Sequence, residues 1–264
     1  MPMPFSTTYD YPDWTQADGI SDAICSGATD GLSGSANDYP NGNTSFPESI
    51  TADANYSAGG GSKGQRHWFH DSNNAISGGT ELDFGATYSE FWVRVYIRFQ
   101  SGFSWGAGNA ATKLLYPFTV GGDGTYCAPG YHDGFFGIQS SDVKNSTTTW
   151  SDIMGGATSD GQFHCYEWHV KADTDGSNGI AQGWIDDVEV MNITNANWGT
   201  PTGWEGTRIG ENHGVCDNAN GPIGSEYAYI DFDDFAVSAT ARIGPLSGGG
   251  GGGPVLGSQL GGLG

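Results

Sequence analysis

The chain has 264 residues, and its 30 acidic and 9 basic side chains give a formal net charge of -21 at pH 7. This charge, together with the scattered positions of Lys and Arg, excludes nucleic acid as an expected partner. The 13 Phe, 12 Tyr and 9 Trp residues can bury a sizeable core, which excludes disorder as a description of the whole chain. No apolar run approaches the ~20 residues that a membrane span requires.

The predicted elements are strands. Residues 6–62 are rich in Gly, Ser, Asn, Asp and Pro, a composition typical of long loops between short strands. Residues 89–99 alternate strictly between apolar and polar side chains, as a half-buried strand does. Further strands are expected at 113–120, 134–139, 163–171, 180–191 and 227–238, with a hairpin turn at 173–179. No window has the period of an amphipathic helix, so the chain is expected to be all-β.

The composition divides the chain into two parts. Residues 1–243 are expected to form a single domain, with a loop-rich N-terminal portion. Residues 244–264 contain six consecutive glycines and then an apolar segment, 254–264. That segment is interpreted either as a peptide that docks on other protein subunits or as a disordered tail.

Four cysteines are widely spaced and form no CxxC pair, which argues against a zinc site. They are Cys25, Cys127, Cys165 and Cys216. Two disulfides, with three possible pairings, are expected, and the alternative is buried free thiols.

Three segments together resemble the concanavalin A-like lectin/glucanase jelly roll, in its laminin-G-like and polysaccharide-lyase-like branch. They are EFWVRVYIRF at 90–99, YEWHVK at 166–171 followed by GWIDDV at 183–188, and YIDFDDFAVS at 229–238. The resemblance implies an antiparallel β-sandwich of two curved sheets, with a concave face that often carries glycans in this superfamily. Asp187 departs from the pattern, because the family usually has Gly at that turn position.

The polar positions of two predicted strands are candidates for glycan contact. Aromatic rings stack on sugars, and Arg forms forked hydrogen bonds with hydroxyls or carboxylates. The candidate glycan-binding residues are Trp92, Arg94, Tyr96, Arg98, Glu167, His169 and Lys171. The alternative is that these side chains satisfy acidic neighbours on adjacent strands.

A catalytic interpretation uses a partly different set of residues. In a polyuronate lyase, Arg or Lys neutralises the C5 carboxylate while His or Tyr removes the C5 proton. The candidates for these roles are Arg94, Lys113, Tyr131, His132 and His169, if both polar faces line one concavity. The E-x-D-x-x-E strand of the superfamily's glucanases is not found, which argues against a retaining hydrolase.

Clustered carboxylates suggest calcium as a cofactor. Asp231 and Asp233 are expected on one face of a strand, and Asp186 adds a further hard oxygen donor. The alternative is a solvated acidic edge.

Taken together, these patterns favour a non-catalytic glycan-binding or surface-decorating structural module. It is expected in a viral (phage) particle or another extracellular assembly, at the extracellular or virion surface. The grounds are the missing catalytic signature, the apolar tail and a start at residues 1–5 that shows no secretory signal. The alternative is a polysaccharide lyase that cleaves a uronate-containing polymer by β-elimination.

Overall fold

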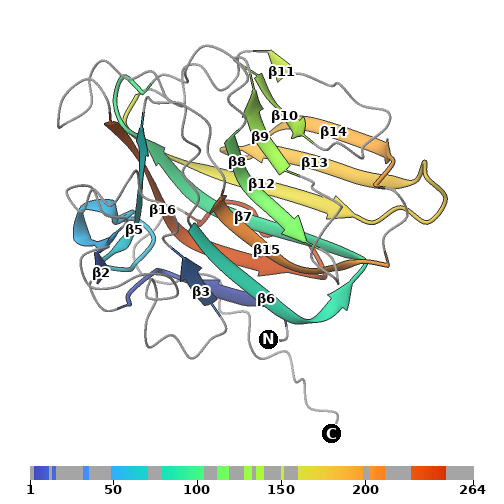
Figure 1. The fold of residues 1–264 in the computed structure, drawn as a ribbon, viewed down its shortest axis with the longest axis horizontal. Helices are drawn as coiled ribbons and strands as arrows, with labels where there is room; N and C mark the ends of the chain where they lie inside the picture. The colour runs from blue at the N-terminus through green and yellow to red at the C-terminus, as the bar shows by residue number, and fades with distance from the viewer. Residues whose placement is uncertain are drawn as a thin grey trace, which may run out of the picture.

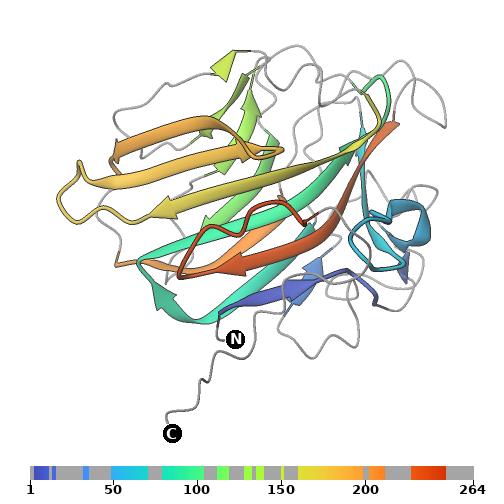
Figure 2. The same ribbon diagram turned by 180° about the vertical axis from the view of Figure 1, so that it is seen from behind.

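The structure is a computed structural model that describes residues 3–11, 14–15, 32–35, 49–70, 79–103, 112–118, 128–132, 135–139, 150–151, 160–198, 202–211 and 227–247. Two antiparallel sheets pack face to face in a jelly-roll β-sandwich, as Figures 1 and 2 show from opposite sides. Within the described residues the helical element is a 3₁₀ turn, η3 (Ala52–Ala54). The predicted all-β fold is therefore confirmed.

The nine-stranded sheet has the order β14-β13-β12-β7-β16-β5-β4-β2, and β1 also pairs with β16. Its strands are β1 (Phe5–Thr7), β2 (Trp14–Thr15), β4 (Ser49–Thr51), β5 (Gly64–His70), β7 (Glu90–Phe99), β12 (Phe163–Lys171), β13 (Gly179–Ile185), β14 (Val188–Ala196) and β16 (Tyr227–Ser238). The seven-stranded sheet has the order β11-β10-β9-β8-β15-β6-β3. Its strands are β3 (Leu32–Ser35), β6 (Gly79–Tyr88), β8 (Thr112–Phe118), β9 (Ala128–His132), β10 (Phe135–Gln139), β11 (Trp150–Ser151) and β15 (Trp204–Glu211).

The core lies between the sheets and follows from strand alternation. The apolar face of β7, from Phe91 to Phe99 at every second residue, is 0–1% exposed. From the other sheet, Leu82 and Phe84 on β6 and Ile209 on β15 pack into the same core. Burial of these large side chains is the main stabilising contribution to the fold.

One predicted strand, 180–191, is in fact two. Asp186 and Asp187 have φ values of 48° and 70°, so the chain turns between β13 and β14. Left-handed backbone at two successive positions is the geometry of a tight hairpin turn, which Asp tolerates better than most residues. Asp187 thus takes the turn position at which the resembling family usually has Gly.

The disulfide prediction fails at one cysteine. Cys165 on β12 is buried and free, and burial raises the pKa of its thiol to about 12. Cys25, Cys127 and Cys216 lie outside the described residues, as does the apolar tail 254–264.

No helix in the described part of the chain is long and apolar enough to cross a membrane.

Candidate functional site

The outer face of the nine-stranded sheet carries most of the charged residues that the sequence singles out. Asp231 on β16 is fully buried and is the acceptor for two arginines. Arg66 Nε donates to Asp231 Oδ1 at 2.7 Å, and Arg98 Nε donates to Oδ2 at 2.9 Å. Both guanidinium groups also donate to the carbonyl of Asp53 in η3. Arg98 is therefore part of an internal ion-pair cluster that joins β5, β7 and β16.

The chain that follows β16 covers the middle of this face. We call residues 239–247 the C-terminal strap, and Figure 2 shows it turning back across β16 and β7. Glu167 on β12 is 1% exposed and accepts from Ile243 N at 2.6 Å and Gly244 N at 3.0 Å. Arg242 Nε donates to the same carboxylate at 3.2 Å. A buried carboxylate with three donors holds the strap on the sheet.

Two further residues of β7 complete the attachment of the strap. The Tyr96 hydroxyl accepts from Leu246 N at 2.9 Å, and burial raises the pKa of Tyr96. Arg94 Nη1 donates to the carbonyl of Gly244 at 3.3 Å. Arg94, Tyr96 and Glu167 are therefore buried beneath the chain itself.

The next row of this face is a hydrogen-bonded ladder across four strands. The Nε2 atom of His169 lies 2.7 Å from Glu90 Oε1, and its Nδ1 atom lies 2.6 Å from Gln182 Oε1. Gln182 continues the ladder by donating to Asn192 Oδ1 at 3.0 Å. The Trp92 ring stacks on His169 with centroids 4.1 Å apart. The ladder holds both ring nitrogens of His169 within the protein.

The predicted glycan-binding residues lie on one face of the nine-stranded sheet, as alternation requires, and most of them contact other parts of the chain. Arg94, Tyr96 and Glu167 hold the strap, Arg98 pairs with Asp231, and Trp92 stacks on His169. Lys171 lies opposite Glu90 at the end of β12. These contacts match the alternative that the side chains satisfy neighbours on adjacent strands.

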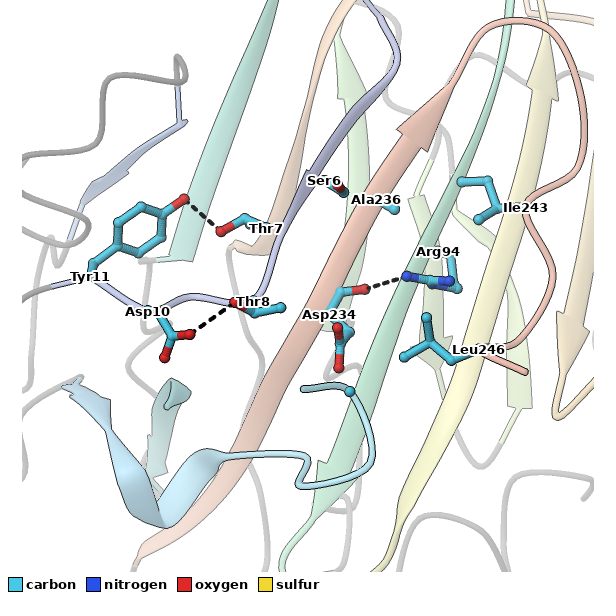
Figure 3. A pocket seen from close by; sticks show the side chains of 11 residues that line it. Ser6, Thr7, Thr8, Asp10, Tyr11, Arg94, Asp234, Ala236, Ile243 and Leu246 are labelled. Carbon is cyan, nitrogen blue, oxygen red and sulfur yellow. Dashed lines mark hydrogen bonds between the residues drawn. The ribbon is translucent and has the colours of Figure 1, made fainter. Parts of the chain in front are cut away.

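A pocket of about 410 Å³ lies between β1, β16 and the strap (Figure 3). Asp234 and Arg94 line it, and in the described structure Asp234 Oδ2 and Arg94 Nε are buried without a hydrogen-bond partner. Burial raises the pKa of Asp234 to about 6 and that of its neighbour Asp233 to about 8. Asp234 has a φ of 48°, and a side chain on Gly59 would collide with its carboxylate, which explains the glycine there.

The three predicted calcium ligands do not form one site. Asp231 is occupied by Arg66 and Arg98. Asp233 accepts from the backbone N–H groups of Tyr56 and Asp234. Asp186 lies in the β13–β14 turn, where it accepts from Cys165 N and contacts His164. Among the described residues, no group of three or more His, Cys, Asp or Glu side chains is arranged to hold a metal.

The five candidate lyase residues are divided between the two sheets. Arg94 and His169 belong to the nine-stranded sheet, whereas Lys113, Tyr131 and His132 belong to β8 and β9 of the seven-stranded sheet. The two sheets pack face to face, so their outer faces point away from one another (Figure 1). The joint role of these five residues in catalysis stays a prediction.

The seven-stranded sheet places a different group of residues together. Thr207 and Ile209 on β15 are fully buried, and Arg208 between them occupies the other alternation phase of the strand. Register places Arg208 opposite Glu81 on β6 and Tyr116 on β8. This row was missed from the sequence, although the alternation of Thr207, Arg208 and Ile209 carried the signal.

A second row on the same outer face is aromatic. Tyr131 lies opposite Thr112, which shares the alternation phase of Tyr116 on β8. Phe136 on β10 lies opposite both Tyr131 and Trp150. The register thus sets one row of backbone positions with Arg208 and Tyr116 and a second with Tyr131, Phe136 and Trp150.

Lys113 and His132 occupy the alternation phase opposite to that of Tyr116 and Tyr131. Lys113 lies opposite Glu211 and shares the phase of the buried Ile209, and His132 is one residue from Tyr131. Of the three predicted residues in this sheet, the register therefore brings only Tyr131 onto the face of Arg208.

No family model matches the chain, and no curated protein matches it. Solved structures do resemble it. Alginate lyase Aly36B is 15% identical with a TM-score of 0.57, covering 90% of this chain and 97% of its own. A variant of Aly36B in complex with an alginate tetrasaccharide is 16% identical with a TM-score of 0.54 over the same shares. The cellulose-induced protein Cip1 is 16% identical with a TM-score of 0.53, covering 85% of this chain and 98% of its own.

These likenesses establish the fold and change the functional interpretation. The expected non-catalytic structural module is wrong as the leading interpretation, because the alginate lyase aligns with nearly the whole chain. The sequence left enzymatic activity open while favouring its absence, and the same likeness contradicts that leaning. The comparisons favour the alternative drawn from the sequence, a polysaccharide lyase.

Proposed function

We propose that this protein is a polysaccharide lyase of the concanavalin A-like superfamily, which cleaves a uronate-containing polymer by β-elimination. The observation that carries the proposal is the fit of alginate lyase Aly36B over 90% of the chain. The site proposed is the outer face of the seven-stranded sheet, since the strap, η3 and a polar ladder occupy the opposite face.

The chemistry needs two functions that this face can supply. The Arg208 guanidinium neutralises the C5 carboxylate of the bound uronate and so makes the C5 proton more acidic. The Tyr131 or Tyr116 phenolate removes that proton, and the electron pair left on C5 forms the C4=C5 bond while the C4–O bond breaks. The leaving oxygen takes up a proton, so the products are a new chain end and an unsaturated uronate.

The aromatic row provides the binding surface beside these groups. Sugar rings present apolar C–H faces that stack on aromatic side chains. Tyr131, Phe136 and Trp150 follow one another across β9, β10 and β11, perpendicular to the strands. A row in this direction suits an extended polymer that crosses the sheet.

The test is the ultraviolet absorbance of the unsaturated uronate after incubation with a panel of polyuronates and mixed polymers. Arg208→Gln, and Tyr116→Phe combined with Tyr131→Phe, are expected to lower kcat/KM by about 10²- to 10⁴-fold. Arg242→Gln and Tyr56→Phe make the same changes on the opposite sheet and are expected to leave kcat/KM within about twofold. Equal losses of kcat/KM in the variants of the two sheets would contradict the proposed location of the site.

For the predicted calcium ion, the supporting observation is the Asp234 pocket. Asp234 Oδ2 is a buried carboxylate oxygen that has no hydrogen-bond partner in the described structure, and Asp10 lines the same pocket. Hard oxygen donors of this kind suit Ca²⁺. Calcium is expected to raise the melting temperature of the wild type in a concentration-dependent manner and to have no effect on Asp234→Asn. Equal melting temperatures in calcium and in chelator would contradict this part of the proposal.

An extracellular location belongs to the same proposal, because large polysaccharides are encountered outside cells.

Docking of the tail 254–264 on another subunit also stays a prediction. Comparing the mass of the native particle with and without residues 254–264 tests it. A mass that does not depend on the tail would contradict it.

A further inference from the structure

The pocket of about 410 Å³ in Figure 3 lies on the nine-stranded side of the sandwich, between β1, β16 and the strap. Its volume falls within the range of about 300–1,000 Å³ that is typical of small-molecule sites. The groups proposed for catalysis belong to the other sheet. A ligand in this pocket would therefore lie on the side of the protein opposite the proposed catalytic face.

Two oppositely charged side chains line the pocket, and each has a polar atom without a hydrogen-bond partner. Asp234 is 5% exposed and Arg94 is 4% exposed. Arg94 donates from Nη1 to the carbonyl of Gly244 and from Nη2 to the carbonyl of Asp234, but its Nε has no acceptor in the described structure. Asp234 Oδ2 likewise has no donor. Unpaired buried polar groups cost free energy, so the pocket favours a ligand that supplies both an acceptor and a donor.

The donor and acceptor pattern narrows the chemistry of that ligand. A carboxylate only accepts and would leave Asp234 Oδ2 unpaired, whereas an ammonium only donates and would leave Arg94 Nε unpaired. A hydroxyl group does both, and it adds no charge to the pocket. Asp10 also lines the pocket, so its carboxylates outnumber its one guanidinium and disfavour an anion. A neutral compound with several hydroxyl groups fits these requirements.

The walls of the pocket match the two kinds of surface that a sugar ring presents. Ser6 and Thr7 of β1 and the adjacent Thr8 contribute hydroxyl groups on one side of β16. Ile243 and Leu246 of the strap contribute aliphatic side chains on the other side. A sugar ring has a rim of hydroxyls and faces of C–H groups, so it can contact both walls at once.

We infer that this pocket binds a neutral sugar unit, with the sugar hydroxyls at Arg94 Nε and Asp234 Oδ2 and its C–H groups against the strap. It is a carbohydrate site separate from the proposed catalytic face and independent of catalysis. Calcium at Asp234 would use the same carboxylate, so the ion and the sugar are expected to exclude one another.

Saturation-transfer NMR on the full chain in chelator tests the site. The probes are the methyl glycosides of glucose, galactose and mannose, each compared with its uronate counterpart. We expect at least one neutral glycoside to bind. Its uronate is expected to bind at least about threefold more weakly, the effect in water of two like charges about 6 Å apart. Added calcium is expected to lower binding of the neutral glycoside.

Variants connect the binding to the pocket. Ser6→Tyr places a ring in the pocket and is expected to abolish the signal, whereas Thr194→Tyr makes a similar change at an exposed position of β14 and is expected to leave it unchanged. Asp234→Asn replaces a charged acceptor by a neutral one and is expected to weaken binding about fivefold. Asp187→Asn is its control outside the pocket. The melting temperature of each variant in chelator shows that it is folded.

The failure of this inference differs from the failure of the proposed function. Absence of saturation transfer to all three neutral glycosides, or an equal signal in folded Ser6→Tyr and Thr194→Tyr, would overturn the inference. Tighter binding of the uronates, or binding that requires calcium, would also overturn it. Each of these results leaves the lyase proposal in place, because that proposal is tested by the unsaturated uronate and by variants of the seven-stranded sheet.

Discussion

The two outer faces of the sandwich use charge in opposite ways. On the nine-stranded sheet, charged side chains bind other parts of the chain. Arg66 and Arg98 bind Asp231, and Arg98 also binds η3. Arg242 of the strap binds Glu167. On the seven-stranded sheet, the register leaves Arg208 in a short row between Glu81 and Tyr116. The first face holds the protein together, and the second is the one on which we place the substrate.

The difference teaches that an alternating strand rich in Arg and aromatic residues does not by itself indicate a binding face. β7 has that pattern, yet Arg94 and Tyr96 on its polar side are buried and bind the strap. A covering segment distant in sequence, here the strap, decides which charged face meets solvent. The predictions below test this division of roles, from the largest expected effect to the smallest.

Asp231→Asn is expected to have the largest effect on stability. It leaves Arg66 and Arg98 without their shared carboxylate in a buried position, which typically costs about 3–5 kcal/mol. Urea unfolding measures the change. Asp53→Asn removes an exposed carboxylate beside the same arginines and is expected to cost less than about 1 kcal/mol. Similar losses in the two variants would contradict the role given to Asp231.

Glu167→Gln tests the attachment of the strap. The variant weakens the bonds from Ile243 N, Gly244 N and Arg242, so we expect a loss of about 2–3 kcal/mol. Hydrogen exchange of residues 240–246 is expected to accelerate. Asp187→Asn weakens only the exposed contact with Arg242 and is the control. If the nine-stranded face is structural, the lyase kcat/KM of Glu167→Gln stays unchanged at a temperature where the variant is folded.

Three groups whose pKa values are raised in the folded state contribute to the pH dependence of stability. Partial burial lowers the pKa of His164, but its hydrogen bonds to Asp186 and Asp160 outweigh this and raise it above 6.5. Burial raises the pKa of Asp234 to about 6 and that of Asp233 to about 8. The folded state therefore binds protons more tightly at each group. Stability is expected to fall as pH rises from about 4 to about 8.

Urea unfolding without divalent cations at several pH values measures this slope. Asp234→Asn removes one of the three groups and tolerates the left-handed backbone at this position. It is expected to flatten the slope and to be more stable than the wild type at pH 8, by about 1–3 kcal/mol. A steeper slope in the variant would contradict the assignment.

Asp187→Gly is expected to have the smallest effect. Glycine relieves the cost of a φ of 70°, about 1 kcal/mol, but loses the exposed contact with Arg242, about 0–1 kcal/mol. The two changes nearly cancel. A melting temperature within a few degrees of the wild type is the expected result, and a large loss would show that the strap depends on Asp187.

Much of the fold could be predicted from local sequence patterns. The alternation of residues 89–99 identified β7 to within one residue, and 227–238 matches the bounds of β16. The turn at Asp186 and Asp187 was missed because Asp at both central positions resembles the polar phase of a continuing strand. The pattern lacked the Gly that normally marks such a turn.

The site was harder to predict, because it depends on which strands become neighbours. Arg94 and Lys113 were grouped on the condition that polar strand faces line one concavity, but β7 and β8 belong to different sheets. Arg208 and Tyr116 are distant in sequence and meet only through the register of β15 with β8. No local pattern shows that residues 239–247 return to cover Arg94 and Tyr96.

The route of the strap also fixes how the protein can be attached to other objects. Ser247, its last residue, follows Leu246 at the Tyr96 hydroxyl on the nine-stranded sheet. A fusion partner, a resin or a surface joined after this residue would therefore hold the molecule by the side opposite Arg208. An immobilised protein of this design would present the seven-stranded sheet outward, toward polymers too large to diffuse around it.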